Sequence, residues 1–109
     1  MFFISIEDFY ERAASCTKLS RKEEIECASK MKNGDYYARE QLVQSYLPMV
    51  AAHIKRVPSH MQSFRLILYC QNALEHAVDT FDFFQVSVSF AHRLSWYMRQ
   101  TVAKYMTRN

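Results

Sequence analysis

Glycine and proline are scarce in this chain, whose 109 residues contain one glycine and two prolines. Tight turns depend on glycine, asparagine and proline, and an all-β domain needs many such turns. The sequence therefore favours long helices joined by few turns. Half of the residues are hydrophobic and 23% are charged, a balance typical of folded proteins. We expect an all-α fold, a compact helical bundle of about five helices, in one domain over residues 1–109.

Capping residues mark the first two helices. Ser5 precedes a predicted helix over residues 6–15, and Ser20-Arg21-Lys22-Glu23 forms a capping box for the second. In a capping box, the hydroxyl and the carboxylate each bind a backbone N–H group that the first helical turn leaves free. Gly34 ends the second helix because glycine tolerates a left-handed backbone. Asp35 then caps a third helix.

Apolar residues at helical spacing define the remaining helices. The third is expected over residues 36–56, with a kink or break at Pro48, which lacks a backbone donor. A fourth is expected over residues 62–80. Residues 85–90 alternate like a strand, but no second convincing strand is available to pair with them, so we interpret them as an extended loop. The last helix is expected over residues 89–107, capped by Ser89.

Charge is distributed unevenly along the chain. Residues 1–54 carry a net charge of −1 and residues 55–109 a net charge of +4, and no acidic residue follows Asp82. Such a skew indicates either an anionic partner or simply a basic, solvated helix end. Both interpretations remain open on composition alone.

The last helix has two distinct faces. Leu94, Met98, Val102 and Tyr105 are expected to face the core, whereas a second stripe is basic and consists of Arg93, Tyr97, Gln100, Lys104 and Arg108, flanked by Trp96, Arg99 and Ala103. Cations neutralise phosphates, amides read base edges and exposed aromatic rings stack on unpaired bases. The alternative is that Trp96 and Tyr97 belong to the core and the cations only keep the helix soluble.

The sequence gives little support for a metal site or an enzyme active site. Cys16, Cys27 and Cys70 are odd in number and widely spaced, which fits reduced thiols in a cytoplasmic protein. The histidines are scattered, and Glu75, His76 and Asp79 on one helix are a weak metal signal. We predict no metal, no cofactor and no enzymatic activity. No apolar run reaches the length of a membrane span, so no membrane association is expected either.

The order of these features resembles the conserved core of sigma-70-class bacterial sigma factors, over about residues 19–108. The first half matches at Leu19-Ser20-Arg21-Lys22-Glu23-Glu24-Ile25-Glu26, Lys32-Asn33-Gly34-Asp35, Ala38-Arg39, Leu42-Val43, Leu47-Pro48-Met49-Val50 and Ile54-Lys55-Arg56. The second half matches more weakly, at Ala77-Val78, Phe81-Asp82, Phe90 and Ser95-Trp96-Tyr97-Met98-Arg99-Gln100. The resemblance implies a helical bundle of the region 2 type.

In that family this domain binds the clamp helices of RNA polymerase and recognises the minus-ten promoter element. The resemblance implies that Trp96 and Tyr97 form the aromatic wedge at the edge of melted DNA, and that Gln100 contacts the upstream edge of the element. It also places Phe90 in the base-capture region, Arg99 at a conserved basic position and Lys104 near phosphate. With the stripe residues, the predicted DNA-binding set is Phe90, Arg93, Trp96, Tyr97, Arg99, Gln100, Lys104 and Arg108.

The sequence departs from the family pattern at several positions. Arg93 and Val88 replace aromatic residues of the base-capture region, and the polymerase-binding helix reads Arg65-Leu66-Ile67-Leu68-Tyr69-Cys70 where the family has acidic and amide groups. Such changes are costly at an interface built on charge complementarity. The predicted partner interface is Arg65, Leu68, Tyr69 and Asn72. The chain also ends before the family's second helix-turn-helix domain, which reads the minus-thirty-five element.

Two functional hypotheses follow. The first is a sigma-like transcription-initiation protein that contacts single-stranded minus-ten promoter DNA and RNA polymerase core, as one part of a split sigma factor whose other chain supplies the missing domain. The second is a sigma-like domain that has lost promoter recognition and serves as a protein-interaction module, which dimerises or binds another regulator. Across the two hypotheses, the candidate protein partners besides polymerase are a second sigma-like chain and an anti-sigma factor. Exposed apolar residues at the altered interface motivate the second hypothesis.

Overall fold

The regular secondary structure of the described residues is helical. The structure, a computed structural model, describes residues 3–108 without the side chain of Arg108, and no strand occurs within that range. Six α-helices follow one another: α1 (Ile6–Ser15), α2 (Arg21–Lys32), α3 (Tyr36–Ser45), α4 (Leu47–Lys55), α5 (Phe64–Thr80) and α6 (Phe90–Arg108). A short 3-10 helix, Ser59–Met61, precedes α5. The expectation of an all-α bundle is confirmed.

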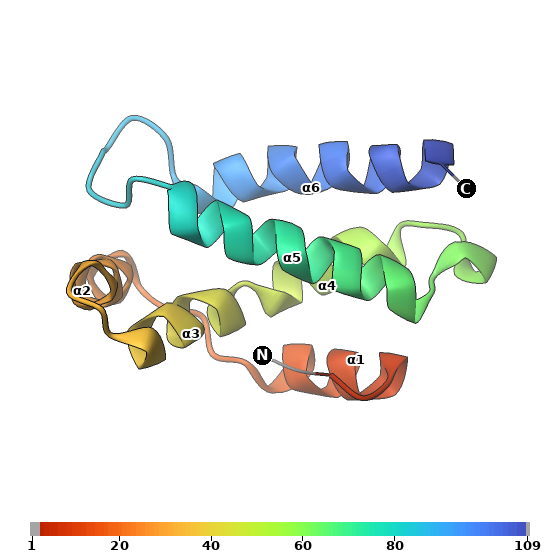
Figure 1. Cartoon of the computed structure of the whole chain (residues 1–109), viewed down its shortest axis with the longest axis horizontal. Coiled ribbons are helices and arrows are strands. Elements are labelled where there is room, and N and C mark those ends of the chain that lie inside the picture. The colour runs from red at the N-terminus through yellow and green to blue at the C-terminus, as the bar shows by residue number, and fades with distance from the viewer. Residues whose placement is uncertain (1–2, 109) are drawn as a thin grey trace.

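The central helix is α5, which packs against α1, α3, α4 and α6. Figure 1 shows α6 lying along one side of α5, with α1 and α3 on the other side and α2 seen nearly end-on, while α4 overlaps α5 in this view. Helix α4 packs against both α5 and α6. The molecule measures 40 × 28 × 21 Å. Buried apolar side chains from all six α-helices form one core cluster, in which Leu42, Val50, Leu66, Leu74 and Leu94 are completely buried.

The predicted caps are present in the structure. The Ser5 hydroxyl accepts a hydrogen bond from the backbone N–H of Asp8 at 3.0 Å. The capping box joins Ser20 and Glu23 through two hydrogen bonds, of 2.9 and 3.1 Å. Gly34 adopts a φ of 90°, a left-handed conformation that explains why the chain turns there between α2 and α3. These local interactions confirm the first three helix starts.

The third predicted helix is divided in two at Tyr46. Pro48 occupies the first turn of α4, where its missing N–H group removes no hydrogen bond and its fixed φ suits the helix. The expected break therefore lies two residues before the proline. The break turns the Tyr46 side chain into the interior, where its hydroxyl donates a hydrogen bond to the buried carboxylate of Glu24 in α2. Burial and this contact raise the pKa of Tyr46.

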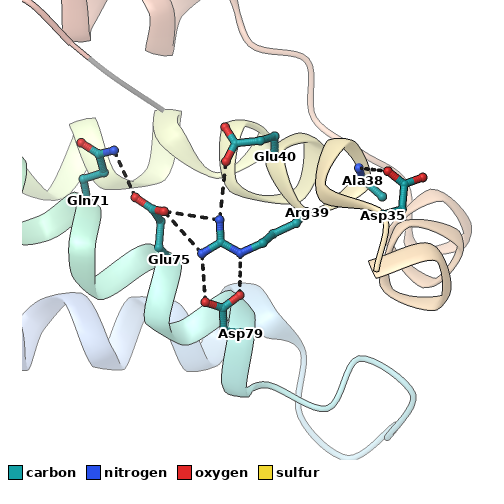
Figure 2. Close-up of polar contacts among 7 residues, drawn as sticks. All are labelled: Asp35, Ala38, Arg39, Glu40, Gln71, Glu75 and Asp79. Atoms are coloured by element: carbon teal, nitrogen blue, oxygen red, sulfur yellow. Dashed lines mark hydrogen bonds and ion pairs between the residues drawn. The ribbon is translucent and has the colours of Figure 1, made fainter. Parts of the chain in front are cut away.

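An ion-pair cluster joins α3 to α5 (Figure 2). The guanidinium of Arg39 donates two hydrogen bonds to the carboxylate of Asp79, at 2.7 and 2.9 Å. It also lies 3.4 Å from Glu75 and 3.5 Å from Glu40. Hydrogen bonding from Arg39 lowers the pKa of Asp79 below its ordinary value of 3.8. Because both oxygens of Asp79 accept hydrogen bonds from Arg39, the pair fixes both the distance between α3 and α5 and the rotation of one helix against the other.

The segment between α5 and α6 is a loop, as interpreted from the sequence. Its shape depends on Gln85, whose side-chain oxygen accepts hydrogen bonds from the backbone N–H groups of Ser87 and Val88 at 2.9 and 3.0 Å. Arg21 of α2 donates to the Gln85 carbonyl at 2.9 Å. Ser89 then caps α6 by accepting a hydrogen bond from His92 at 3.1 Å. These hydrogen bonds give the loop a defined shape, which in turn determines where α6 begins relative to α5.

We predict that Arg39→Met lowers the free energy of unfolding by roughly 1–3 kcal/mol at neutral pH, because it leaves three partly exposed carboxylates facing one another. The contribution of Asp79 is present above pH 3.8 and is lost as the pH falls through the lowered pKa of the folded state. The difference between the two proteins should therefore shrink in acid. Urea unfolding across the pH range measures this.

Arg12→Met is the matched control, because the Arg12 side chain is 51% exposed and pairs with Asp8 within one helix. Its expected cost is below about 1 kcal/mol. Equal losses for the two substitutions would contradict a structural role of the Arg39 cluster.

Candidate nucleic-acid interface

The inner face of α6 fixes which residues the helix presents to solvent. Leu94 and Met98 are fully buried, Thr101 is buried, and Val102 and Tyr105 pack against the core from a half-buried position. Tyr105 also shares a 3.0 Å hydrogen bond with Ser63, the cap of α5. The predicted core face is therefore correct, and the opposite face is free to contact a partner.

Five residues of the predicted DNA-binding set are exposed on α6. These are Arg93, Trp96, Arg99, Gln100 and Lys104. The indole of Trp96 is 51% exposed, which is unusual for so large an apolar side chain and excludes a core role for it. Tyr97 is half-buried, with its ring edge-on to His76 of α5 at 6.3 Å between centroids. The side chain of Arg108 lies outside the described residues.

The structure buries Phe90, which the resemblance places in the base-capture region. Its ring is 1% exposed and lies among Tyr46, Phe81 and Phe83 at centroid distances of 4.7, 5.1 and 5.0 Å. As the first residue of α6 it points inward, onto the junction between α3 and α4. A base cannot stack on a ring enclosed in this way, so Phe90 supports the start of α6 from within and does not contact DNA in this conformation.

The exposed residues divide between two edges of α6. Successive residues are about 100° apart around a helix, so Arg93, Tyr97 and Lys104 lie on the edge toward α5, while Arg99 lies on the edge toward α4. Trp96 and Gln100, four residues apart, occupy the solvent face between them. The sequence pattern described one stripe with flanking residues, whereas the structure spreads these groups over the whole outer half of the helix.

Two hollows adjoin Tyr97 between α5 and α6. One, of about 350 Å³, is lined at its rim by Arg93 and Val88 and on the α5 side by Ala77 and Thr80. The other, of about 310 Å³, is lined by Tyr69, Asn72 and His76 of α5 together with Tyr97 and Lys104 of α6. Arg93 and Val88, the two departures from the family's aromatic pattern, thus lie at the same hollow.

The predicted partner interface forms one face of α5. Arg65 and Asn72 are exposed, Leu68 is 40% exposed, and Tyr69 is half-buried against Tyr105 at 5.7 Å between ring centroids. Tyr69 and Asn72 line the same hollow as Lys104. The two predicted surfaces, one on α5 and one on α6, therefore meet along a shared groove.

The arginines fall into two groups according to their contacts. Arg12 and Arg39 bind carboxylates, and Arg21 binds the loop carbonyl of Gln85. Four others have no carboxylate within ion-pair distance among the described residues, namely Arg56, Arg65, Arg93 and Arg99. An unpaired cation attracts external anions more strongly than a neutralised one. Arg56, at the end of α4, was absent from the predicted site because nothing in its local pattern places it beside α6.

No group of three or more histidine, cysteine or acidic side chains suited to a metal ion occurs among residues 3–108. The carboxylates of Glu75 and Asp79, weighed above as metal ligands, instead bind Arg39. Cys70 is completely buried in the core, where burial raises the pKa of its thiol to about 12. No helix within the described range has the length and apolar character needed to cross a membrane.

The chain is similar to a known protein over most of its length. The chain is 36% identical over 87 residues to the RNA polymerase sigma factor SigA of Clostridium acetobutylicum. The match covers 79% of this chain but only 23% of the length of that protein. No family model matches the sequence. The similarity supports a sigma-70-like region in the chain.

We predict effects of very different size on stability for alanine substitution of two aromatic residues of α6. Phe90→Ala should lower the free energy of unfolding by roughly 3–5 kcal/mol, because it leaves a cavity beneath the start of the helix. Trp96→Ala, at an exposed position, should change it by less than about 1 kcal/mol. Urea unfolding followed by circular dichroism measures both. The reverse order would show that α6 is rotated from the position described.

Proposed function

We propose that this chain is a sigma-like transcription-initiation protein, which contacts single-stranded minus-ten promoter DNA through α6 and RNA polymerase core through α5. The observation that carries the proposal is the composition of the outer half of α6. There the exposed indole of Trp96 lies beside the amide of Gln100 and three exposed basic side chains, those of Arg93, Arg99 and Lys104, and no acidic residue occurs in the helix. The similarity to a protein named as an RNA polymerase sigma factor supports the same conclusion.

Each exposed group on α6 suits one part of an opened DNA strand. Stacking of an unpaired base on an aromatic ring such as Trp96 contributes roughly 1–3 kcal/mol. The amide of Gln100, one turn further along, can pair with a base edge and distinguish one base from another. Arg93 and Lys104 can neutralise backbone phosphates. Together these groups favour a strand whose bases are unpaired over an intact duplex.

The α5 surface supports the polymerase contact. Leu68 and Arg65 are exposed on the side of α5 that leads into the groove beside Lys104. A partner on this surface would lie next to a strand on α6, so both contacts can form at once. In our proposal the chain acts together with a second polypeptide, as one part of a split sigma factor.

We predict that Trp96→Ala weakens binding of labelled single-stranded minus-ten DNA by about 5- to 100-fold, the equivalent of one lost base stack. Gln100→Ala should mainly reduce the preference for the minus-ten strand over a scrambled strand, because the amide reads a base edge. Fluorescence anisotropy at two salt concentrations measures both effects.

Tyr37→Ala is the matched control for loss of an exposed aromatic ring, since Tyr37 is 72% exposed on α3, outside the proposed interface. It should leave binding unchanged. Binding that ignores sequence and disappears with added salt would overturn the promoter-reading role.

A separate prediction concerns the polymerase. Arg65→Asp and Leu68→Gln should each reduce recovery of core polymerase by the tagged chain several-fold, because burial of an apolar side chain and charge complementarity both stabilise such interfaces. Arg12→Asp and Ile4→Gln are the controls, as they make the same changes at exposed positions on another surface.

If none of the four substitutions changes the amount of polymerase recovered, the polymerase interface lies elsewhere on the chain. If polymerase is never recovered while a second sigma-like chain or an anti-sigma factor is, the chain acts as a protein-interaction module.

A further inference from the structure

A hollow of about 370 Å³ lies where the end of α4 meets the second half of α6. On one side it is lined by His53 of α4 and by the segment that follows the helix, Arg56, Val57 and Pro58. On the other side, α6 contributes residues spaced along a single helix face, namely Arg99, Val102, Ala103 and Met106. It shares no lining residue with the two hollows beside Tyr97.

The hollow is positively charged. Arg56 and Arg99 reach it from different helices, no acidic residue lines it, and neither arginine has a carboxylate partner among the described residues. His53, 9% exposed, forms part of the wall. Burial lowers the pKa of His53, and the two guanidinium groups lower it further. The hollow therefore brings two charged donors together with no internal anion to neutralise them.

The remaining wall is apolar. Val57 is buried, Val102 and Met106 are half-buried, and Pro58 and Ala103 are exposed at the edge. A small inorganic anion would use only the two arginines and leave this wall exposed to water. A ligand that joins an anionic group to a less polar body would contact both parts. A sugar–phosphate unit of a nucleic acid strand has this composition.

The hollow is continuous with the exposed face of α6. Arg99 follows Trp96 by three residues, which is roughly 4.5 Å along the helix axis. A strand with a base stacked on Trp96 would therefore bring a neighbouring phosphate to the level of Arg99. The edge of α6 toward α4 offers that phosphate Arg56 as a second cation, which the α6 sequence alone does not supply.

We propose that this hollow binds a backbone phosphate, with its sugar, of the nucleic acid strand that crosses α6, and that Arg56 and Arg99 hold the phosphate together. The inference rests on the proposed function and extends the interface from α6 to α4. It assigns a binding role to Arg56 and a lining role to Val57 and Met106.

The first test is anisotropy of the labelled minus-ten strand with Arg56→Gln, Arg99→Gln and the double variant. Each single substitution should weaken binding about three- to tenfold. The double variant should reduce the slope of log K against log salt by about 0.7, the value for one phosphate contact on a single strand, and each single variant should reduce it by less. Because both side chains hold one phosphate, the double variant should lose less than the product of the two single effects.

Lys55→Gln is the matched control. Lys55 neighbours Arg56 in sequence, but its ammonium group lies over the ring of Tyr10 in α1, at 5.0 Å. It removes the same charge from the same part of the chain and should change binding by less than about twofold. Equal effects of Arg56→Gln and Lys55→Gln would overturn the proposed phosphate site and leave the proposed function intact.

The second test follows the His53 ring by NMR during pH titration. Adding the minus-ten strand should raise the pKa of His53, because a bound phosphate offsets the field of Arg56 and Arg99. Arg56→Gln should reduce this response, and the double variant should abolish it. Inorganic phosphate at the same concentration should have no effect. A response to inorganic phosphate alone would identify a small-anion site and overturn the assignment to a strand.

The two proposals fail in different ways. If the strand binds and depends on Trp96 but the His53 pKa does not move, the phosphate site is overturned and promoter contact remains. If the unaltered chain binds no strand at all, both proposals are overturned.

Discussion

The packing of α6 against α5 determines the rest of the molecule's surface chemistry. Leu94 and Met98 are fully buried and Thr101 is buried, so the helix cannot rotate without exposing apolar area worth roughly 1.5–3 kcal/mol for each large side chain. With this face fixed, Trp96 and Gln100 must point to solvent. The outer face of α6 is thus a direct result of which residues the core requires.

The position of α5 depends in turn on α3. The two oxygens of Asp79 bind Arg39 and leave little freedom of rotation at that end of α5. Phe90, enclosed by Tyr46, Phe81 and Phe83, anchors the start of α6 at the same end. Hence the least exposed aromatic residue of the predicted site contributes by positioning its exposed neighbours. A residue can be essential to an interface without touching the ligand.

Local patterns in the sequence predicted most of the fold. The Ser20 capping box, Gly34 and Asp35 act within a few residues of one another, so their outcome does not depend on distant parts of the chain. The break at Tyr46 was expected from Pro48, but its position two residues before the proline was not. The contact that Tyr46 makes there, with Glu24 in α2, joins distant parts of the chain, and the sequence contains no local sign of it.

The candidate site was predicted in part, and for similar reasons. Periodicity along α6 separated Leu94 and Met98 from Trp96 and Gln100, because one helix defines both faces. It could not place Phe90, since the ring's environment comes from the loop and from Tyr46 at the junction of α3 and α4. Nor could it find Arg56, which lines the same hollow as Arg99 only because α4 packs on α6. Residues brought together by tertiary contacts lie beyond the reach of a pattern along one segment.

The hydrogen bond between Tyr46 and Glu24 has an evolutionary consequence. Both groups are buried, and the loss of either one leaves the other without its partner in the interior, at a cost of about 1–3 kcal/mol. Replacing both by apolar residues of similar shape avoids most of that cost. Proteins that descend from this chain should therefore keep both residues or lose them together, so that positions 24 and 46 change in concert.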